Sequence, residues 1–155
     1  MQKIAVDVAP GLAHGPSSEA CRTLGRRVRR AALRMGYLPK TLPEIGVRVV
    51  DDRAIAKMHQ QFMGESGPTD VLSFPAEGTP GDIVLSWDAV RRQARDSGSA
   101  ALLDEATVLC VHGLAHLLGH DHRSRAQGRK MHNVERHALK AVGVQDIVRP
   151  YAPSS

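Results

Sequence analysis

The chain has 155 residues, of which 42% are hydrophobic and 24% are charged, and its formal net charge is +5. These values fit one globular domain with a single core, and the positive charge favours a polyanionic partner. Aromatic residues make up only 3% of the chain, which argues against a sheet that stacks RNA bases on aromatic rings. The two cysteines provide neither a disulfide framework nor a cysteine-based metal motif. The start of the chain lacks an apolar run typical of a signal peptide, and no stretch is expected to approach the length of a membrane span, so we expect a soluble cytoplasmic protein.

The N-terminal part predicts a strand followed by a helix. Residues 3–8 alternate apolar and polar side chains, as in a half-buried strand. A serine at position 17 or 18 is expected to cap a helix that runs to about Met35 and stops at Gly36. The face of this helix opposite its apolar stripe carries a set of arginines: Arg22, Arg26, Arg27, Arg29, Arg30 and Arg34. Such a face is either simply solvated or contacts phosphate groups, which arginine binds by bidentate hydrogen bonds.

The middle of the chain predicts three more strands, over residues 45–50, 69–74 and 82–87. A short helix capped by an aspartate is expected to follow the first of these strands, and Pro75 is expected to end the second. The short loop before residue 82 predicts an antiparallel pair, whereas connections through helices predict that the first three strands of the chain are parallel. The expected fold class is therefore α/β (α+β), with a mixed four-stranded sheet packed against about five helices.

The C-terminal part predicts three helices, over residues 88–97, 101–118 and 124–142, the last of them stopped by a glycine. Apolar residues nearly encircle the second of these helices, so we expect it to be central and buried. We expect a single domain over residues 1–148 and a disordered tail over residues 149–155, which contains two prolines and two serines.

The predicted central helix ends in a motif of three histidines. His112 and His116 are four residues apart, a spacing that places both side chains on one face of a helix. Gly119 can end the helix in the left-handed conformation, so that the chain turns and His122 approaches the same point. This spacing matches the metzincin pattern, in which three histidines bind one zinc ion and leave a fourth position open. We therefore predict a metzincin-like zinc helix in which His112, His116 and His122 bind one Zn²⁺ ion.

The position after the first histidine separates this motif from that of the metalloproteases. Metalloproteases carry a general-base Glu there, whereas this chain has Gly113, which is expected to leave room beside the metal. His120 is interpreted as a solvated residue of the turn. Asp121 either orients a ligand imidazole through its ring N–H or simply forms the turn. Three further histidines lack a partner at ligand spacing and are interpreted as exposed surface residues: His59, His132 and His137.

Three blocks of the sequence resemble the bacterial YbeY family of rRNA maturation endoribonucleases. Residues 112–122 resemble its H-G-x-L-H-L-x-G-Y-D-H signature, with Ala115 in place of the usual Leu and His120 in place of the usual Tyr. Residues 68–75 resemble its P-T-D-V-L-S-F-P segment, and residues 81–84 its G-D-I strand. The order and spacing of the blocks also fit, and the resemblance covers most of the chain from about residue 45 to 144.

This resemblance implies a zinc-dependent endoribonuclease that is specific for single strands and acts in 16S rRNA 3′-end maturation and ribosome quality control. The implied partners are single-stranded RNA, rRNA and the ribosome, and neither DNA nor a membrane is expected. One departure bears on activity. Before the P-T-D segment the family normally reads Y-R-G, and its Arg is linked to activity, whereas this chain has Met63 there. Because Met63 cannot hydrogen-bond a phosphate, either Lys57 or an arginine of the first helix replaces that Arg, or activity is weakened; we assign no catalytic residue.

Three functions are compatible with these observations. The first is metal-assisted RNA cleavage, in which the nucleophile is either water activated by the metal or the RNA 2′-OH. The second is a metallohydrolase of peptides or small molecules, which the histidine spacing favours and the missing Glu disfavours. The third is a non-catalytic ribosome-binding factor with a structural zinc, which Met63 favours and an open coordination position disfavours.

Overall fold

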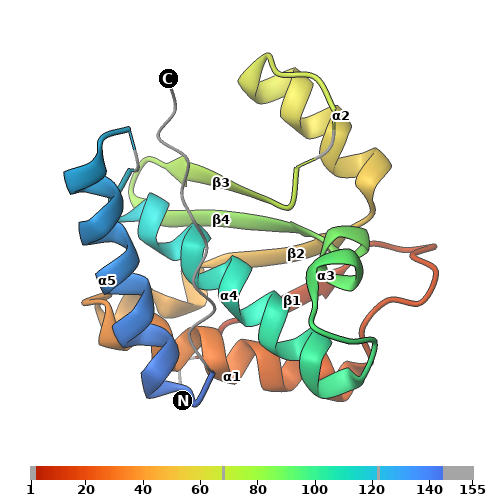
Figure 1. The fold of residues 1–155 in the computed structure, drawn as a ribbon, viewed down its shortest axis with the longest axis horizontal. Coiled ribbons are helices and arrows are strands. Elements are labelled where there is room, and N and C mark those ends of the chain that lie inside the picture. The colour runs from red at the N-terminus through yellow and green to blue at the C-terminus, as the bar shows by residue number, and fades with distance from the viewer. Residues whose placement is uncertain (1–2, 68, 122, 145–155) are drawn as a thin grey trace.

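The computed structural model describes residues 3–67, 69–121 and 123–144, so the expected tail over residues 149–155 lies outside the described residues. The described strands are β1 (Val6–Val8), β2 (Gly46–Val50), β3 (Val71–Ala76) and β4 (Thr79–Ser86). The described α-helices are α1 (Ser18–Arg34), α2 (Asp52–Met63), α3 (Trp87–Gln93), α4 (Ser99–Leu117) and α5 (Arg125–Ala141), and a 3₁₀ helix, η1, spans Pro39–Glu44. Figure 1 shows the strands stacked as one sheet, with α1, α4 and α5 together and α2 apart from them.

The sheet is mixed, as predicted, and its strand order is β1-β2-β4-β3. β1 pairs parallel with β2, β2 pairs parallel with β4, and β3 pairs antiparallel with β4. The prediction that the first three strands are all parallel was therefore wrong for β3, because β4 inserts between β2 and β3. β4 supplies the buried Ile83 and Leu85, which suit an inner strand, whereas β3 continues through Pro75, which lacks a ladder donor and suits an edge.

Side-chain caps set the beginnings of the helices close to where the sequence predicts them. The Ser17 side chain accepts a hydrogen bond from the Ala20 backbone N–H at the start of α1, at 3.0 Å. Asp51 caps α2 and Ser124 caps α5 in the same way. α3 begins at Trp87 with Ser86 as its cap, so this helix starts one residue earlier than expected and is shorter. Each cap satisfies a backbone donor that the first turn leaves without an intrahelical partner.

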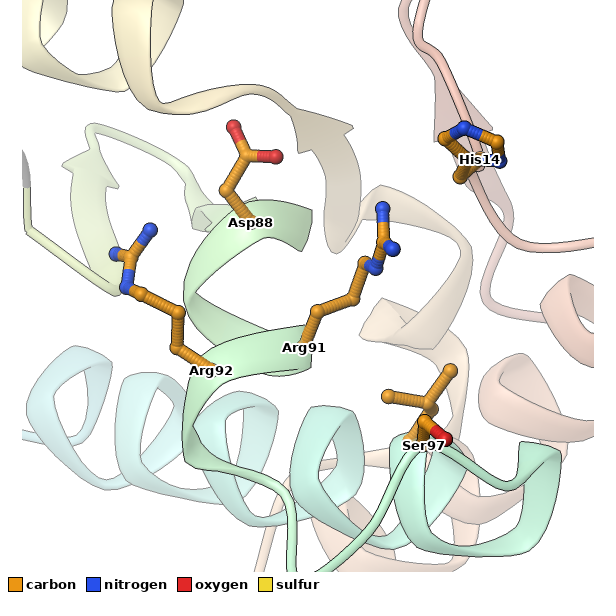
Figure 2. A pocket seen from close by; sticks show the side chains of 6 residues that line it. His14, Asp88, Arg91, Arg92 and Ser97 are labelled. Atoms are coloured by element: carbon orange, nitrogen blue, oxygen red, sulfur yellow. The ribbon is translucent and has the colours of Figure 1, made fainter.

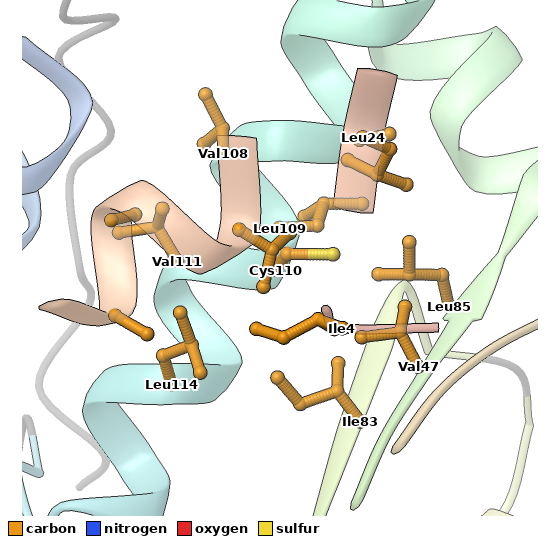
Figure 3. Packing of buried hydrophobic residues seen from close by; sticks show 14 of the residues in the cluster. Ile4, Leu24, Val47, Ile83, Leu85, Val108, Leu109, Cys110, Val111 and Leu114 are labelled. Atoms are coloured by element: carbon orange, nitrogen blue, oxygen red, sulfur yellow. The ribbon is translucent and has the colours of Figure 1, made fainter. Parts of the chain in front are cut away.

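α4 is the central helix of the main hydrophobic core. Its buried residues, among them Leu109 and Leu114, pack with Leu24 of α1 and with Ile83 and Leu85 of β4 (Figure 3). Tyr37 donates its hydroxyl to the Leu114 carbonyl at 2.6 Å within this core. The expectation that no stretch has the length of a membrane span was wrong, since α4 is long and apolar enough. Its burial explains that composition, because a helix surrounded by protein is apolar on most of its sides.

A smaller cluster lies on the other face of the sheet. Ile55 of α2 packs there with Leu72 of β3 and with Val50 and Val84 of the neighbouring strands. Alternate residues of β3 and β4 therefore face α2 on one side and α4 on the other, as the two-residue period of a strand requires. β3 and β4 therefore lie between α2 and α4 and contact both helices.

Candidate active site

His112 and His116 lie on successive turns of α4 and direct their Nε2 atoms toward each other. The two Nε2 atoms are 3.1 Å apart, and the rings are nearly perpendicular, at 90°. Two nitrogens bound to one tetrahedral zinc ion, each at about 2.0–2.1 Å, would be about 3.3 Å apart. The same separation fits an N–H···N hydrogen bond when no metal is bound. The pair is therefore spaced so that a metal ion could bind both nitrogens with only a small shift.

Glu135 of α5 fixes the orientation of the first histidine. Its Oε1 lies 2.8 Å from Nδ1 of His112, and the residue is only 4% exposed. A buried carboxylate accepts here, so Nδ1 of His112 carries the proton and Nε2 presents its lone pair toward His116. This contact joins α4 to α5 and sets both the tautomer and the tilt of the ring.

The sequence did not identify Glu135, and one reading gave the orienting role to Asp121. In the structure Glu135 takes that role at His112, and Asp121 accepts from the Arg123 guanidinium at 2.9 Å in the turn after α4. A signal was present, because Glu135 shares the buried face of α5 with Met131 and Leu139. A carboxylate in an apolar stripe is almost never fully buried unless it is paired.

The chain reverses direction directly after His116. Gly119 has a φ of +93°, its N–H donates to the His116 carbonyl at 2.9 Å, and the His120 N–H donates to the Ala115 carbonyl at 3.0 Å. This is the left-handed helix end that the sequence predicted. The third predicted ligand, His122, lies outside the described residues. Within residues 3–67, 69–121 and 123–144, no group of three or more His, Cys, Asp or Glu side chains is arranged to hold a metal ion.

Gly113 faces the sheet, so the expectation that it leaves room beside the metal was wrong. A Cβ atom on Gly113 would lie 3.1 Å from both Cγ atoms of Ile83 and 3.2 Å from the Ser73 hydroxyl. That hydroxyl donates to the Gly113 carbonyl at 3.1 Å. The sheet therefore fills the space that a larger residue at position 113 would need, and α4 approaches β3 and β4 closely at this point.

Met63 ends α2 and is 45% exposed. The loop after it is held by His59, whose Nδ1 lies 3.0 Å from the Gly67 carbonyl and whose Nε2 lies 2.9 Å from a Glu65 carboxylate oxygen. The interpretation of His59 as an exposed surface residue was wrong, because its side chain is only 13% exposed and fastens this loop. Lys57, one of the two proposed replacements for the family's Arg, is exposed on α2.

A separate hollow of about 520 Å³ lies near the other end of α4. Figure 2 shows Arg91 and His14 on opposite sides of it, with Asp88 and Arg92 also projecting from α3. Arg92 pairs with Asp52 at 2.6 Å and holds the pKa of that carboxyl below its ordinary value, and Asp88 accepts from the Asp52 backbone N–H at 2.8 Å. These contacts tie α2 to α3, so the polar groups of this hollow serve the fold rather than the histidine pair.

The fold and the site together define a domain built on a mixed α/β sheet, with a carboxylate-oriented histidine pair on its central helix. The family model described as Endoribonuclease YbeY matches residues 15–143. An endoribonuclease YbeY of Chelativorans sp. (strain BNC1) is 35% identical over 158 residues, which cover 95% of this chain and 93% of the relative. The chain belongs to the YbeY family of endoribonucleases, which are hydrolases that act on RNA.

Further relatives are similar over shorter stretches. An endoribonuclease YbeY of Leifsonia xyli subsp. xyli (strain CTCB07) is 38% identical over 109 residues, which cover 62% of this chain and 71% of the relative. A solution structure of a Thermotoga maritima protein is 25% identical and covers 87% of this chain and 89% of that chain, with a TM-score of 0.49.

Replacing Gly113 by Glu restores the metalloprotease sequence motif but should destabilise the fold. The new side chain would bury a carboxylate against Ile83 and Ser73, which combines overpacking with desolvation and should cost about 3 kcal/mol or more of unfolding free energy. Urea denaturation measures the change. Ala100→Glu, at an exposed position of the same helix, is the matched control and should stay within about 0.5 kcal/mol of the unmodified protein. Equal stability of the two variants would contradict the close approach of α4 to the sheet.

Proposed function

We propose that this protein is a zinc-dependent endoribonuclease specific for single strands, in which His112, His116 and His122 hold one Zn²⁺ ion. The observation that carries the proposal is the convergence of the His112 and His116 Nε2 atoms, 3.1 Å apart, with Glu135 behind the first ring. Membership of the YbeY family supports RNA as the substrate. Following the family resemblance, we propose rRNA and the ribosome as partners, 16S rRNA 3′-end maturation and ribosome quality control as the process, and the cytoplasm as the location.

The donor set fits zinc on chemical grounds. Imidazole nitrogens suit Zn²⁺, and three neutral histidines leave the fourth position open, as catalytic zinc sites do. Metal-binding histidines typically donate their other ring N–H to a carboxylate, which is the relation of His112 to Glu135. The buried negative charge of Glu135 would also offset part of the charge of the cation. His122 supplies the third nitrogen in this proposal, because the left-handed turn at Gly119 sends the chain back after His116.

In this proposal the histidines bind the zinc ion and Glu135 orients the ring of His112. A zinc ion in such a site supplies Lewis acidity toward a phosphoryl oxygen and lowers the pKa of water. Glu135 holds the proton of His112 on Nδ1, so that the lone pair of Nε2 stays available to bind a metal ion. This chain has Gly113 at the position where a metalloprotease carries its carboxylate general base, and the lack of that base supports RNA cleavage over peptide hydrolysis.

The test of this proposal compares cleavage of single-stranded RNA with cleavage of a peptide library, each with and without a chelator. The unmodified protein should bind one zinc ion per chain and cleave RNA only. His116→Ala should lose both the zinc and the cleavage, whereas His137→Ala, at an exposed position of α5, should keep both. Binding of RNA without cleavage would favour a ribosome-binding factor, and cleavage of peptides alone would favour a peptidase. Analysis of the RNA ends would distinguish attack by water from attack by the 2′-OH.

Removing the charge of Glu135 should weaken zinc binding without abolishing it. Glu135→Gln keeps a hydrogen-bond acceptor near Nδ1 but loses the negative charge, and Glu135→Ala loses both, so zinc affinity should fall roughly 10-fold and 100-fold respectively. Competition with a chromophoric chelator measures the affinity, and circular dichroism checks that each variant is folded. Glu44→Gln, on the exposed surface of η1, is the control. Unchanged zinc affinity in Glu135→Ala would refute the orienting role.

Met63→Arg should raise RNA cleavage, because the arginine would restore a cation where the family places one. Met63 lies at the exposed end of α2, before a loop that is held by the contact of His59 with the Gly67 carbonyl. The added guanidinium would therefore belong to a segment with a defined position. A single donor to developing phosphate charge is commonly worth ~10²–10³ in rate, which sets the upper range of the expected gain.

The measurement for Met63→Arg is the cleavage rate at saturating RNA and equal zinc content, at low and moderate salt. Gln60→Arg adds the same charge to an exposed position one turn earlier in α2 and controls for improved binding. A rate at saturation that does not exceed that of the control would mean that position 63 does not act on the phosphate.

A further inference from the structure

α1 presents a set of arginines that the histidine site does not use. This arginine face consists of Arg22, Arg26, Arg29 and Arg30, of which Arg29 is half-buried and the other three are exposed. The opposite side of α1 is buried in the core through Leu24 and its neighbours. Arg27 does not belong to the face, because its guanidinium pairs with Asp104 of α4 at 2.9 Å.

The arginine face is concave rather than flat. A hollow of about 560 Å³ lies between α1 and residues 3–6, and a second of about 300 Å³ lies between α1 and Val142, just after α5. Arg26 and Arg29 line both hollows. Gly25 lets the Ile4 backbone approach α1 closely beside the first hollow, since a Cβ atom there would lie 2.6 Å from the Ile4 carbonyl oxygen. Along the helix, Arg22 and Arg30 are separated by about 12 Å, so the face offers a row of donors longer than a single phosphate group needs.

Three arginines of the face, Arg22, Arg26 and Arg30, keep their charge exposed. Glu19 is the one acidic residue in α1. In the part of the chain that the structure describes, no acidic side chain forms an ion pair with Arg22, Arg26 or Arg30. Planar guanidinium groups in a row match the anionic oxygens of a polymer of phosphates, which they bind by bidentate hydrogen bonds.

The face lies on a different side of the molecule from the histidine pair. α1 packs beside β1, at one edge of the sheet, whereas Ser73 of β3, at the other edge, contacts α4 next to His112. Three strand spacings separate β1 from β3, which is about 15 Å. Figure 1 shows α1 along the side of the sheet that is remote from β3 and α2. A phosphate at the arginine face is therefore not the phosphate at the histidines.

We propose that the arginine face binds the sugar-phosphate backbone of the RNA substrate at a point remote from the cleaved bond. This inference rests on the proposed function in so far as RNA is the substrate. The contacts are with phosphate groups, so they hold the RNA without reading its sequence and they release counterions, which makes binding dependent on salt. Short RNA that reaches only the histidines does not use the face, and longer RNA uses both.

The experiment compares two single-stranded RNAs, of about 5 and about 30 nucleotides, a range that brackets the site sizes of known single-strand binders. The test variant carries Arg22→Glu, Arg26→Glu and Arg30→Glu together. The matched control carries Lys40→Glu, Arg53→Glu and Arg91→Glu, which change the net charge equally but lie scattered on η1, α2 and α3. Affinity is measured as a function of salt, and cleavage of each RNA is measured with zinc-loaded protein.

For the long RNA, the test variant should bind roughly 10- to 100-fold more weakly at about 0.15 M salt, and its log–log salt slope should fall by about 2, as expected for three lost phosphate contacts. Its cleavage of the short RNA should equal that of the control. A slope equal to that of the control would overturn the inference and leave the face as solvated surface. Arginine-dependent binding of polyglutamate in preference to RNA would also overturn it, in favour of an acidic protein partner. If the unmodified protein binds the long RNA through these arginines but cleaves no RNA, the proposed function fails and this inference stands.

Discussion

The contact between α4 and the sheet at Gly113 determines where the functional side chains stand. Because Gly113 lacks a side chain, the helix backbone approaches Ile83 closely, and the Ser73 hydroxyl satisfies the Gly113 carbonyl. Successive side chains of a helix are rotated by about 100° around its axis. When one residue faces the sheet, the side chain of the residue before it therefore points to the side of the helix. His112 consequently points toward α5, where its ring contacts the Glu135 carboxylate. His116 follows one turn later on the same side of the helix. A rotation of α4 would break the sheet contact and the histidine arrangement together.

The pairing of His112 with Glu135 makes two helices depend on each other. A buried carboxylate loses its hydration and is tolerated only with a well-placed partner, so α5 docks where the imidazole meets Glu135. Such pairs contribute little net stability compared with apolar packing, but the loss of one member leaves the other uncompensated. Met131 and Leu139 are buried on the same helix, so α5 combines ordinary apolar burial with a polar contact that serves the site.

Sequence signals between residues close along the chain predicted much of this structure. The errors concern contacts between elements that are far apart in the sequence. Ser17, Asp51 and Ser124 revealed the helix starts because a cap is a contact between residues three apart. The spacing of His112 and His116 predicted their convergence for the same reason, since one helical turn relates them. By contrast, the place of β4 between β2 and β3 depends on which strand buries more surface, and chain order does not encode it.

The roles of Gly113, Glu135 and His59 were also not predicted from the sequence, because their partners lie in other elements or in an irregular loop. Ile83 and Ser73 meet Gly113 from two strands, and Glu135 meets His112 across 23 residues. An isolated glycine in a helix pattern indicates a close contact or a functional position without distinguishing them. The buried carboxylate of α5 is a non-local feature that the composition of a helix face could have revealed.

The edge position of Pro75 has a consequence for how this protein behaves at high concentration. An outer strand presents unpaired backbone donors and acceptors that can recruit a strand of another molecule and begin aggregation. Pro75 removes one donor from β3, and the register shift between Phe74 and Ala76 interrupts the regular spacing of the rest. The strand whose Ser73 contacts α4 beside the histidines is thereby a poor template for pairing with a strand of another molecule.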